Sequence, residues 1–231
     1  MFVEVKDVTK EYGKKLALDH VSFGAEKGRV LGILGENGAG KSTLFRIISS
    51  VTKTSHGAVI VDGKPVGLES RKITAFVPEI NPFYDWMSVI EQLEFLAAFY
   101  DGWDMAKTRE LLKFLGLPER DKIGTLSKGQ QVKLKIAFAF SWPAKLILLD
   151  EPLSGIDLVA RKKIIGTLFN EYRYGEQTIL MSTHLVHEVE EFFEDVIYLR
   201  NGKIALQGSA DNLREEKGKS LVGIFEEIYS V

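Results

Sequence analysis

The chain has 231 residues, 45% of them hydrophobic, which is enough to fill the core of one sizeable domain. Thirty Lys and Arg against 32 Asp and Glu leave a net charge of −2, so no basic excess indicates a nucleic-acid partner. The absence of Cys excludes disulfides, thiolate metal sites and a cysteine nucleophile. The first residues lack the order of a signal peptide, and no apolar stretch approaches the ~18 residues of a membrane span. We therefore expect a cytosolic chain that reaches a membrane only through another protein.

The first third of the sequence predicts mainly strands. Residues 2–8 alternate between polar and apolar side chains, and residues 21–23 follow a turn at 12–15, which predicts an antiparallel layer. Residues 29–34 are apolar on both faces, as in a central parallel strand, and residues 41–50 predict the following helix. Two more strands are expected at residues 59–61 and 73–77, the second ended by Pro78.

The middle of the chain predicts helices. Residues 88–141 have helical periodicity almost throughout. Ser88 and Glu91 have the spacing of a capping box, and Asp104 can cap a second helix. We expect a helical subdomain over about residues 84–142, inserted into a single domain.

The last third returns to alternating strands and helices, beginning with an apolar strand at residues 145–150. This alternation predicts an α/β fold with a mostly parallel sheet, an N-terminal antiparallel β layer and the inserted helical subdomain. The other expected elements are helices at residues 157–172, 186–193 and 221–228 and strands at 178–181, 196–199 and 203–206.

The segment between the strand at 29–34 and the helix at 41–50 matches the P-loop pattern. Its glycines leave backbone N–H groups free to surround phosphate oxygens, and the helix N-terminus attracts the same anion. Lys41 adds a full positive charge, Ser42 offers a hydroxyl to Mg²⁺, and Thr43 adds a phosphate donor. The sequence therefore predicts a P-loop NTPase core that binds a nucleotide with Mg²⁺. The predicted nucleotide-binding residues of this segment are Gly35, Glu36, Asn37, Gly38, Ala39, Gly40, Lys41, Ser42 and Thr43.

Two carboxylates end the apolar strand at 145–150. Neighbouring strand residues point to opposite sides, so Asp150 and Glu151 can have different tasks. We assign Asp150 to Mg²⁺, through water, and Glu151 to the attacking water as general base or positioning group. The alternative is that both are solvated residues at a strand end.

Residues 126–130, Leu-Ser-Lys-Gly-Gln, resemble the Leu-Ser-Gly-Gly-Gln signature of ATP-binding-cassette (ABC) ATPases, with a departure only at Lys128. Ser127 and Gln130 also fit a capping box at a helix start, and both interpretations can hold together. A capped N-terminus that presents Ser127 and the Gly129 amide can clamp a γ-phosphate. We include all four residues from Ser127 to Gln130 in the nucleotide site.

Further residues lie in the order that this family implies, and the resemblance covers essentially all 231 residues. Tyr12 resembles the aromatic residue that stacks on adenine, and Glu79 lies where the family has its Q-loop glutamine, a metal ligand. Residues 154–157 resemble the D-loop, in which we assign Asp157 to the nucleotide site. His184 matches the switch histidine and is expected to act with Lys41 in catalysis. Taken singly, Tyr12 and His184 also fit packing and strand-end roles.

The resemblance implies a mechanism that one copy cannot complete. Two cassettes meet head to tail, and each ATP lies between the P-loop of one and the signature of the other. We therefore expect ATP and Mg²⁺ as cofactors, and a second ABC ATPase, identical or different, as one partner. The other expected partner is an integral membrane permease on the inner face of the cell membrane. The short C-terminal segment resembles that of drug, peptide and antibiotic exporters, which favours export.

Two other interpretations remain open. A soluble ABC ATPase without a membrane partner, as in iron–sulfur cluster assembly, is compatible with every residue discussed. A P-loop GTPase or small-molecule kinase would leave residues 126–130 and 154–157 without a function. The chain also has no Asn-Lys-x-Asp motif for guanine recognition.

Overall fold

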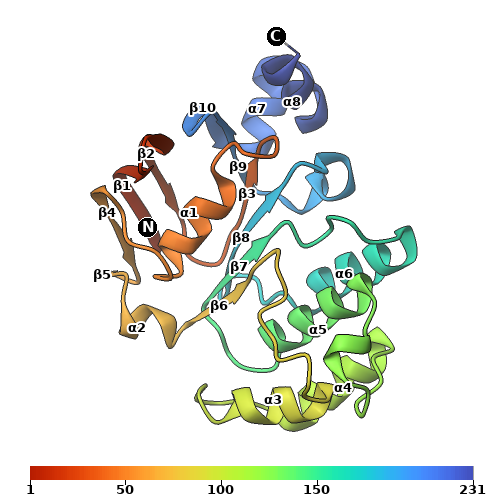
Figure 1. Ribbon diagram of the computed structural model, residues 1–231. Helices are drawn as coiled ribbons and strands as arrows, with labels where there is room; N and C mark the ends of the chain where they lie inside the picture. The colour runs from red at the N-terminus through yellow and green to blue at the C-terminus, as the bar shows by residue number, and fades with distance from the viewer. Residues whose placement is uncertain (231) are drawn as a thin grey trace.

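Two β-sheets organise the computed structural model, which describes residues 1–230 (Figure 1). The first is an antiparallel sheet in the strand order β2-β1-β4-β5. Tyr12 pairs with Lys15 across the tight turn between β1 and β2, so the predicted antiparallel layer is confirmed with longer strands than expected. The four strands are β1 (Val3–Tyr12), β2 (Lys15–Ala25), β4 (His56–Val61) and β5 (Lys64–Pro65).

The second sheet has six strands in the order β10-β9-β3-β8-β7-β6. All neighbours are parallel except β9 and β10, which form an antiparallel hairpin around Asn201 and Gly202. This mixed architecture confirms the predicted fold class. The strands are β3 (Val30–Leu34), β6 (Thr74–Val77), β7 (Leu146–Asp150), β8 (Thr178–Thr183), β9 (Asp195–Arg200) and β10 (Lys203–Ser209).

Helices cover both faces of the six-stranded sheet. Figure 1 shows α1 between the two sheets, and α3, α4 and α5 on the side away from the antiparallel sheet. The α-helices are α1 (Lys41–Ile48), α2 (Leu68–Arg71), α3 (Val89–Ala97), α4 (Met105–Leu115), α5 (Lys128–Phe140), α6 (Leu158–Glu171), α7 (Ala210–Lys217) and α8 (Leu221–Tyr229). Short 3₁₀ turns lie at Ile123–Thr125, Val186–Glu188 and Glu190–Phe192.

The central strand β3 contributes to two hydrophobic cores. Leu31 and Ile33 pack in the core shared with α1 and the antiparallel sheet. Val30 and Leu34, which point to the other face, pack in the core shared with the remaining helices. A strand covered on both faces must be apolar at every position, which explains its unbroken hydrophobic sequence.

The helical segment begins its helices at the predicted caps. The Ser88 hydroxyl accepts from the Glu91 amide, and the Glu91 carboxylate accepts from the Ser88 amide at 2.7 Å. Asp104 Oδ1 accepts from the Lys107 amide at 2.9 Å at the start of α4. These contacts satisfy amides that have no partner inside the helix, so both predicted caps are confirmed.

The predicted helix at residues 186–193 is wrong. The chain forms two 3₁₀ turns separated by Val189, whose φ of −140° is not helical. The buried side chains Val186, Val189 and Phe192 recur every third residue, which is the period of a 3₁₀ turn rather than of an α-helix.

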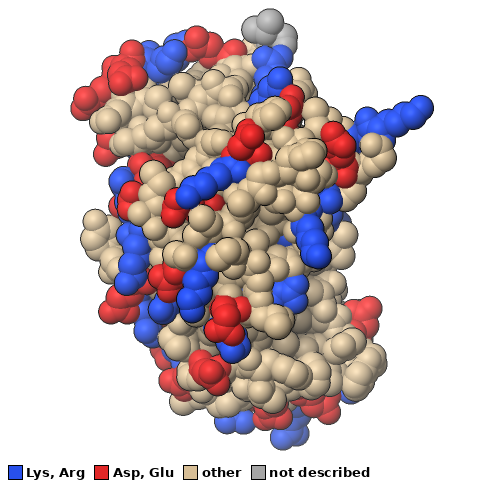
Figure 2. Space-filling view, turned by 90° about the vertical axis from the view of Figure 1, so that its left-hand side faces the viewer, with Lys and Arg blue, Asp and Glu red and all other residues tan. Residues whose placement is uncertain are grey.

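Charges of both signs are mixed on the face displayed in Figure 2, and Lys and Arg do not gather into one broad basic area there. This distribution agrees with the balanced composition of the chain.

Candidate nucleotide-binding site

The predicted phosphate-binding loop connects β3 to α1. Gly38 and Gly40 have φ angles of 85° and 110°, which side chains other than glycine rarely adopt. A Cβ at Gly40 would also lie 2.7 Å from the carbonyl oxygen of Ala17 on β2, so this position has no room for a side chain. Glycine is therefore required where the loop turns into α1.

Neighbouring strand ends hold the loop in place. The Gly35 amide donates to the Thr183 carbonyl of β8 at 3.3 Å, and the Gly202 amide donates to the Ala39 carbonyl at 3.0 Å. A Cβ at Gly35 would lie 2.5 Å from the Leu199 carbonyl of β9. The loop is thus anchored on the carboxyl ends of the strands, where ligands bind in open α/β sheets.

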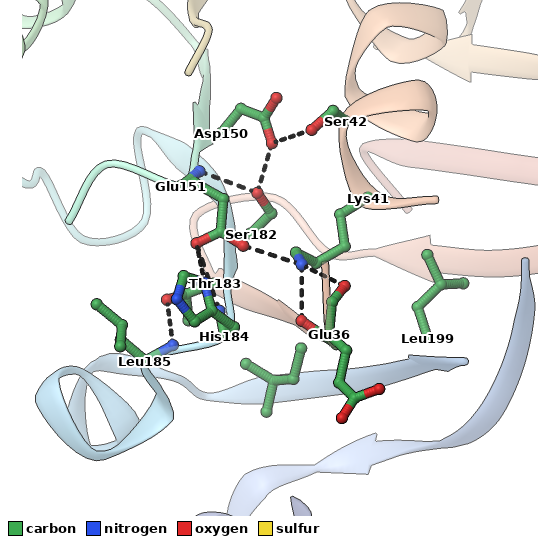
Figure 3. Close-up of polar contacts among 12 residues, drawn as sticks. Glu36, Lys41, Ser42, Asp150, Glu151, Ser182, Thr183, His184, Leu185 and Leu199 are labelled. Carbon is green, nitrogen blue, oxygen red and sulfur yellow. Dashed lines mark hydrogen bonds and ion pairs between the residues drawn. The ribbon is translucent and has the colours of Figure 1, made fainter. Parts of the chain in front are cut away.

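Lys41 points back over the loop and is only 5% exposed (Figure 3). Its Nζ donates to the carbonyl oxygens of Gly35 at 2.6 Å and Glu36 at 2.9 Å. It also forms an ion pair with Glu151 Oε1 at 2.9 Å. The predicted phosphate-binding cation and the predicted catalytic carboxylate are therefore in direct contact.

Asp150 and Ser42 bring oxygen atoms together beside the loop. Asp150 Oδ1 accepts from the hydroxyls of Ser42 at 3.1 Å and Ser182 at 2.7 Å (Figure 3). Burial raises the pKa of the Asp150 carboxyl, and the two hydroxyl hydrogen bonds act in the opposite direction. Hydroxyl and carboxylate oxygens are hard donors of the kind that Mg²⁺ takes, usually together with water and phosphate oxygens, so these residues fit the expected metal.

Glu151 follows Asp150 with φ of 49°, an unfavourable conformation for a residue with a side chain. Its amide donates to the Ser182 hydroxyl at 3.1 Å, which holds the turn. This turn directs the carboxylate toward two partners at once. Oε1 contacts Lys41, whereas Oε2 lies 2.9 Å from His184 Nδ1. The structure thus brings together the three residues predicted to act in catalysis, because β3, β7 and β8 are neighbours in the sheet.

A cavity of about 290 Å³ opens beside this cluster. Sequence reasoning did not select Lys15 and Ala17, which belong to β2 and reach the cavity only because the antiparallel sheet packs over α1. The only sequence feature that could have indicated a role for Lys15 and Ala17 is their position just after the turn that contains Tyr12. The lining residues are Lys15, Ala17, Asn37, Gly38, Gly40, Lys41, Ser42, Thr43, Glu79 and Glu151.

Tyr12, the expected adenine-stacking residue, lies at the edge of this region. Its side chain is 46% exposed, and the Lys10 ammonium lies 4.8 Å from its ring centroid. Its strand partner Lys15 lines the cavity. An exposed ring beside the cavity is open for stacking, and its role stays a prediction.

The residues of the Leu-Ser-Lys-Gly-Gln segment do not line the cavity within the part of the chain that the structure describes. Ser127 and Gln130 form the expected capping box at the start of α5, with the Gln130 amide donating to the Ser127 hydroxyl at 3.2 Å. Gly129 packs against the start of α6, where a Cβ would lie 3.2 Å from the Ala160 Cβ. Asp157 caps α6 by accepting from the Ala160 amide at 2.9 Å. Lys128 is exposed beside them.

Lys135 is a site residue that sequence reasoning missed. It lies in the middle of α5, is only 3% exposed, and donates to the carbonyl oxygens of Pro78 at 2.6 Å and Glu79 at 2.9 Å. Burial lowers the pKa of Lys135 to about 8, although Asp150 and Glu79 favour its charged form. The position of this lysine among apolar residues of a predicted helix is the sequence feature that could have indicated a buried, functional role.

The strand, glycine loop and helix around Lys41, with Asp150 at the end of β7, which is separated from β3 only by β8, define a P-loop nucleotide-binding protein. Comparison with known proteins narrows this class, because residues 18–154 match the family model described as ABC transporter. The chain belongs to the ABC transporter family and is an ATP-binding subunit with the ATPase cassette of that family.

Curated relatives cover nearly the whole chain. The ATP-binding protein NatA of Bacillus subtilis is 34% identical over 221 residues, which are 90% of this chain and 89% of that protein. EcsA of the same organism is 32% identical over 94% of this chain and 90% of its own length. The linearmycin resistance protein LnrL is 31% identical over 94% of this chain and 72% of its own.

Solved structures agree with the fold. The ATP-binding subunit of an ABC transporter superposes with a TM-score of 0.87 at 28% identity, covering 98% of this chain and 99% of that one. A dimeric cassette in a post-hydrolysis state with ADP and Pi gives a TM-score of 0.80 at 27% identity, over 90% of this chain and 98% of its own. Within residues 1–230, no helix has the length and apolar character needed to cross a bilayer.

Proposed function

We propose that this subunit binds ATP with Mg²⁺, pairs with a second cassette, and drives a separate integral membrane permease from the inner face of the cell membrane, in the direction of export. The observation that carries the catalytic part is the series of contacts from the buried Lys41 through the buried Glu151 to the half-buried His184 beside the P-loop cavity. Phosphoryl transfer to water uses a cation for the phosphate oxygens and a group that positions the attacking water, and Lys41 and Glu151 can supply these two functions.

The chain's own residues account for binding and positioning. The free amides of the loop receive the phosphate oxygens, and the Lys41 ammonium turns from the Gly35 and Glu36 carbonyls toward the β- and γ-phosphates. This movement releases Glu151 Oε1, which can then accept a proton from the attacking water. His184 holds the other carboxylate oxygen and keeps the carboxylate in place. Water attacks the γ-phosphorus, and the bond to the leaving oxygen of ADP breaks.

Ser42 and Asp150 would hold the metal, with Glu79, which also lines the cavity, as a further ligand. When bound, Mg²⁺ neutralises charge on the phosphate oxygens.

Pairing of cassettes is supported by the lining of the cavity, which, among the described residues, includes none from the Leu-Ser-Lys-Gly-Gln segment. Ser127, Gly129 and Gln130 lie at the N-terminus of α5, and none of them lines the P-loop cavity of the same copy. A second copy turned head to tail can present these residues to the γ-phosphate. The solved dimeric cassette with ADP and Pi supports the pairing of two cassettes.

A permease partner is supported by an exposed aromatic cluster on the helical segment. Trp86 and Phe99 are 67% and 65% exposed, and Tyr84 and Phe95 are about half exposed. Their rings form a contact series, with centroid distances of 5.7 Å, 6.1 Å and 5.2 Å. Contiguous exposed aromatic surface marks a protein interaction site, and this cluster follows the loop that carries Glu79. A cytoplasmic segment of the permease is the occupant that we propose.

Export is supported by the names of relatives, which include a linearmycin resistance protein and a Nod factor export protein. The alternative is an ABC ATPase that works without a membrane partner.

The test is affinity purification of the tagged chain from native membranes, with Trp86→Ala/Phe99→Ala as the comparison. We expect an integral membrane protein to copurify with the wild type and to be lost from the variant, whose ATP binding is unchanged. Recovery of only soluble partners would support the alternative and contradict the permease proposal.

A further inference from the structure

Lys135 connects two parts of the molecule that are more than fifty residues apart in the sequence. Its ammonium group lies inside the protein, with 3% of the residue exposed, and donates to two consecutive carbonyl oxygens, those of Pro78 and Glu79. Burying an ammonium group is costly unless it is fully hydrogen-bonded. An apolar residue would fill this helix position without that cost, so the lysine calls for an explanation.

The two parts are the signature helix and the loop of Glu79. Pro78 and Glu79 directly follow β6, a strand of the six-stranded sheet. Lys135 lies on α5, eight residues after Ser127, which corresponds to about 12 Å along a helix that rises 1.5 Å per residue. Through its two hydrogen bonds, a displacement of α5 acts directly on the backbone that carries Glu79.

Electrostatics supports the same link. Asp150 and Glu79 are the two carboxylates that attract the Lys135 ammonium. Glu79 and Glu151 also repel Asp150, so three negative side chains gather around the phosphate cavity. Lys135 offsets the negative charge of Asp150 and Glu79, whereas Lys41 pairs with Glu151.

We propose that Lys135 is a positioning residue for hydrolysis, which holds the Glu79 loop against the signature helix so that the Glu79 carboxylate stays at the cavity and follows the movement of α5. The inference rests on the proposed place of Glu79 beside the triphosphate. The inference adds Lys135, a residue outside the cavity, as the group that controls the position of Glu79. Loss of the link should slow the chemical step more than it weakens ATP binding, because the P-loop contacts are intact.

The experiment uses Lys135→Met, which keeps the length of the stem but loses the ammonium, and Lys135→Gln, which keeps a shorter uncharged donor. Lys113→Met, at an exposed position near the end of α4, is the matched control. For Lys135→Met we expect kcat to fall about tenfold or more with KM for ATP within about threefold, because misplaced groups slow chemistry before they weaken binding. Amide hydrogen exchange of residues 77–82 should become about tenfold faster. Lys135→Gln should change kcat and the exchange rate in the same directions but by smaller factors. Lys113→Met should match the wild type in both quantities.

A Lys135→Met protein with wild-type kcat, or with wild-type exchange in residues 77–82, would overturn the proposal. A proportional rise in KM with kcat unchanged would also overturn it, because it would place Lys135 in binding rather than positioning. If Lys135→Met does not fold, the same outcomes are decided by Lys135→Gln. Glu151→Gln is measured in parallel: normal hydrolysis in that variant would contradict the proposed catalytic mechanism, whereas the exchange of residues 77–82 reports on the Lys135 link independently of hydrolysis.

Discussion

Lys41 and Glu151 form an ion pair of 2.9 Å in which both side chains are almost fully buried. The pair joins the start of α1 to the end of β7, two elements more than one hundred residues apart in sequence. Because Lys41 is also the cation expected to meet the phosphates, the proposed mechanism predicts that nucleotide binding releases Glu151 from the ion pair.

Glu151→Gln is expected to lower ATP hydrolysis about 100-fold or more while preserving nucleotide binding, since a general base contributes on this order. The neutral amide also frees Lys41 from its ion pair, so ADP affinity should rise rather than fall. Steady-state ATPase assays and ADP titration test the two parts. Hydrolysis at the wild-type rate would remove Glu151 from the mechanism.

Lys41→Ala is expected to weaken ATP binding about 100-fold, because charge-assisted hydrogen bonds to the phosphates are each worth about 1.5–3 kcal/mol. The substitution also leaves the Glu151 carboxylate buried without its cation, so the variant should melt at a lower temperature than the wild type. Titration with a fluorescent ATP analogue and thermal unfolding are the measurements. Unchanged affinity would mean that the phosphates bind elsewhere.

Glu79→Gln is expected to reduce the dependence of ATP affinity on Mg²⁺. A carboxylate at the cavity attracts the metal but repels the phosphates when the metal is absent. The amide removes both effects, so ATP should bind more tightly than in the wild type without Mg²⁺. ATP titrations of both proteins with Mg²⁺ and with EDTA decide the matter, and equal Mg²⁺ dependence would refute a metal role for Glu79.

Tyr229→Phe is expected to destabilise the protein by about 1 kcal/mol, the usual value of one hydrogen bond. The Tyr229 hydroxyl donates to the Leu199 carbonyl at 2.7 Å and lies 3.4 Å from the Leu34 carbonyl, directly before the P-loop. A modest loss of nucleotide affinity should accompany the loss of stability, because α8 supports the base of the loop. Urea unfolding and ATP titration measure the two effects; identical unfolding curves would show that the hydroxyl is not needed.

Much of the fold follows from local sequence patterns. The apolar run of β3, the caps at Ser88, Asp104 and Ser127, and the Asn-Gly turn between β9 and β10 depend on residues within a few positions of one another. The incorrect prediction of a helix at residues 186–193 also arose from a local sequence pattern. The apolar residues there suggest a helix from sequence, whereas the buried side chains Val186, Val189 and Phe192 have the three-residue period of 3₁₀ turns.

The phosphate loop, the acidic strand end and the residue types of the site are predictable from the sequence, because steric freedom at glycine and the chemistry of Lys, Ser, Asp and Glu are local properties. The packing of the strands and helices brings Glu151 into contact with both Lys41 and His184, and brings Lys15 of β2 to the cavity. It also buries Lys135 against the Glu79 loop. These relationships depend on which strands become neighbours and on where burial makes an unpaired charge costly, and neither is encoded in the spacing of residues along the chain.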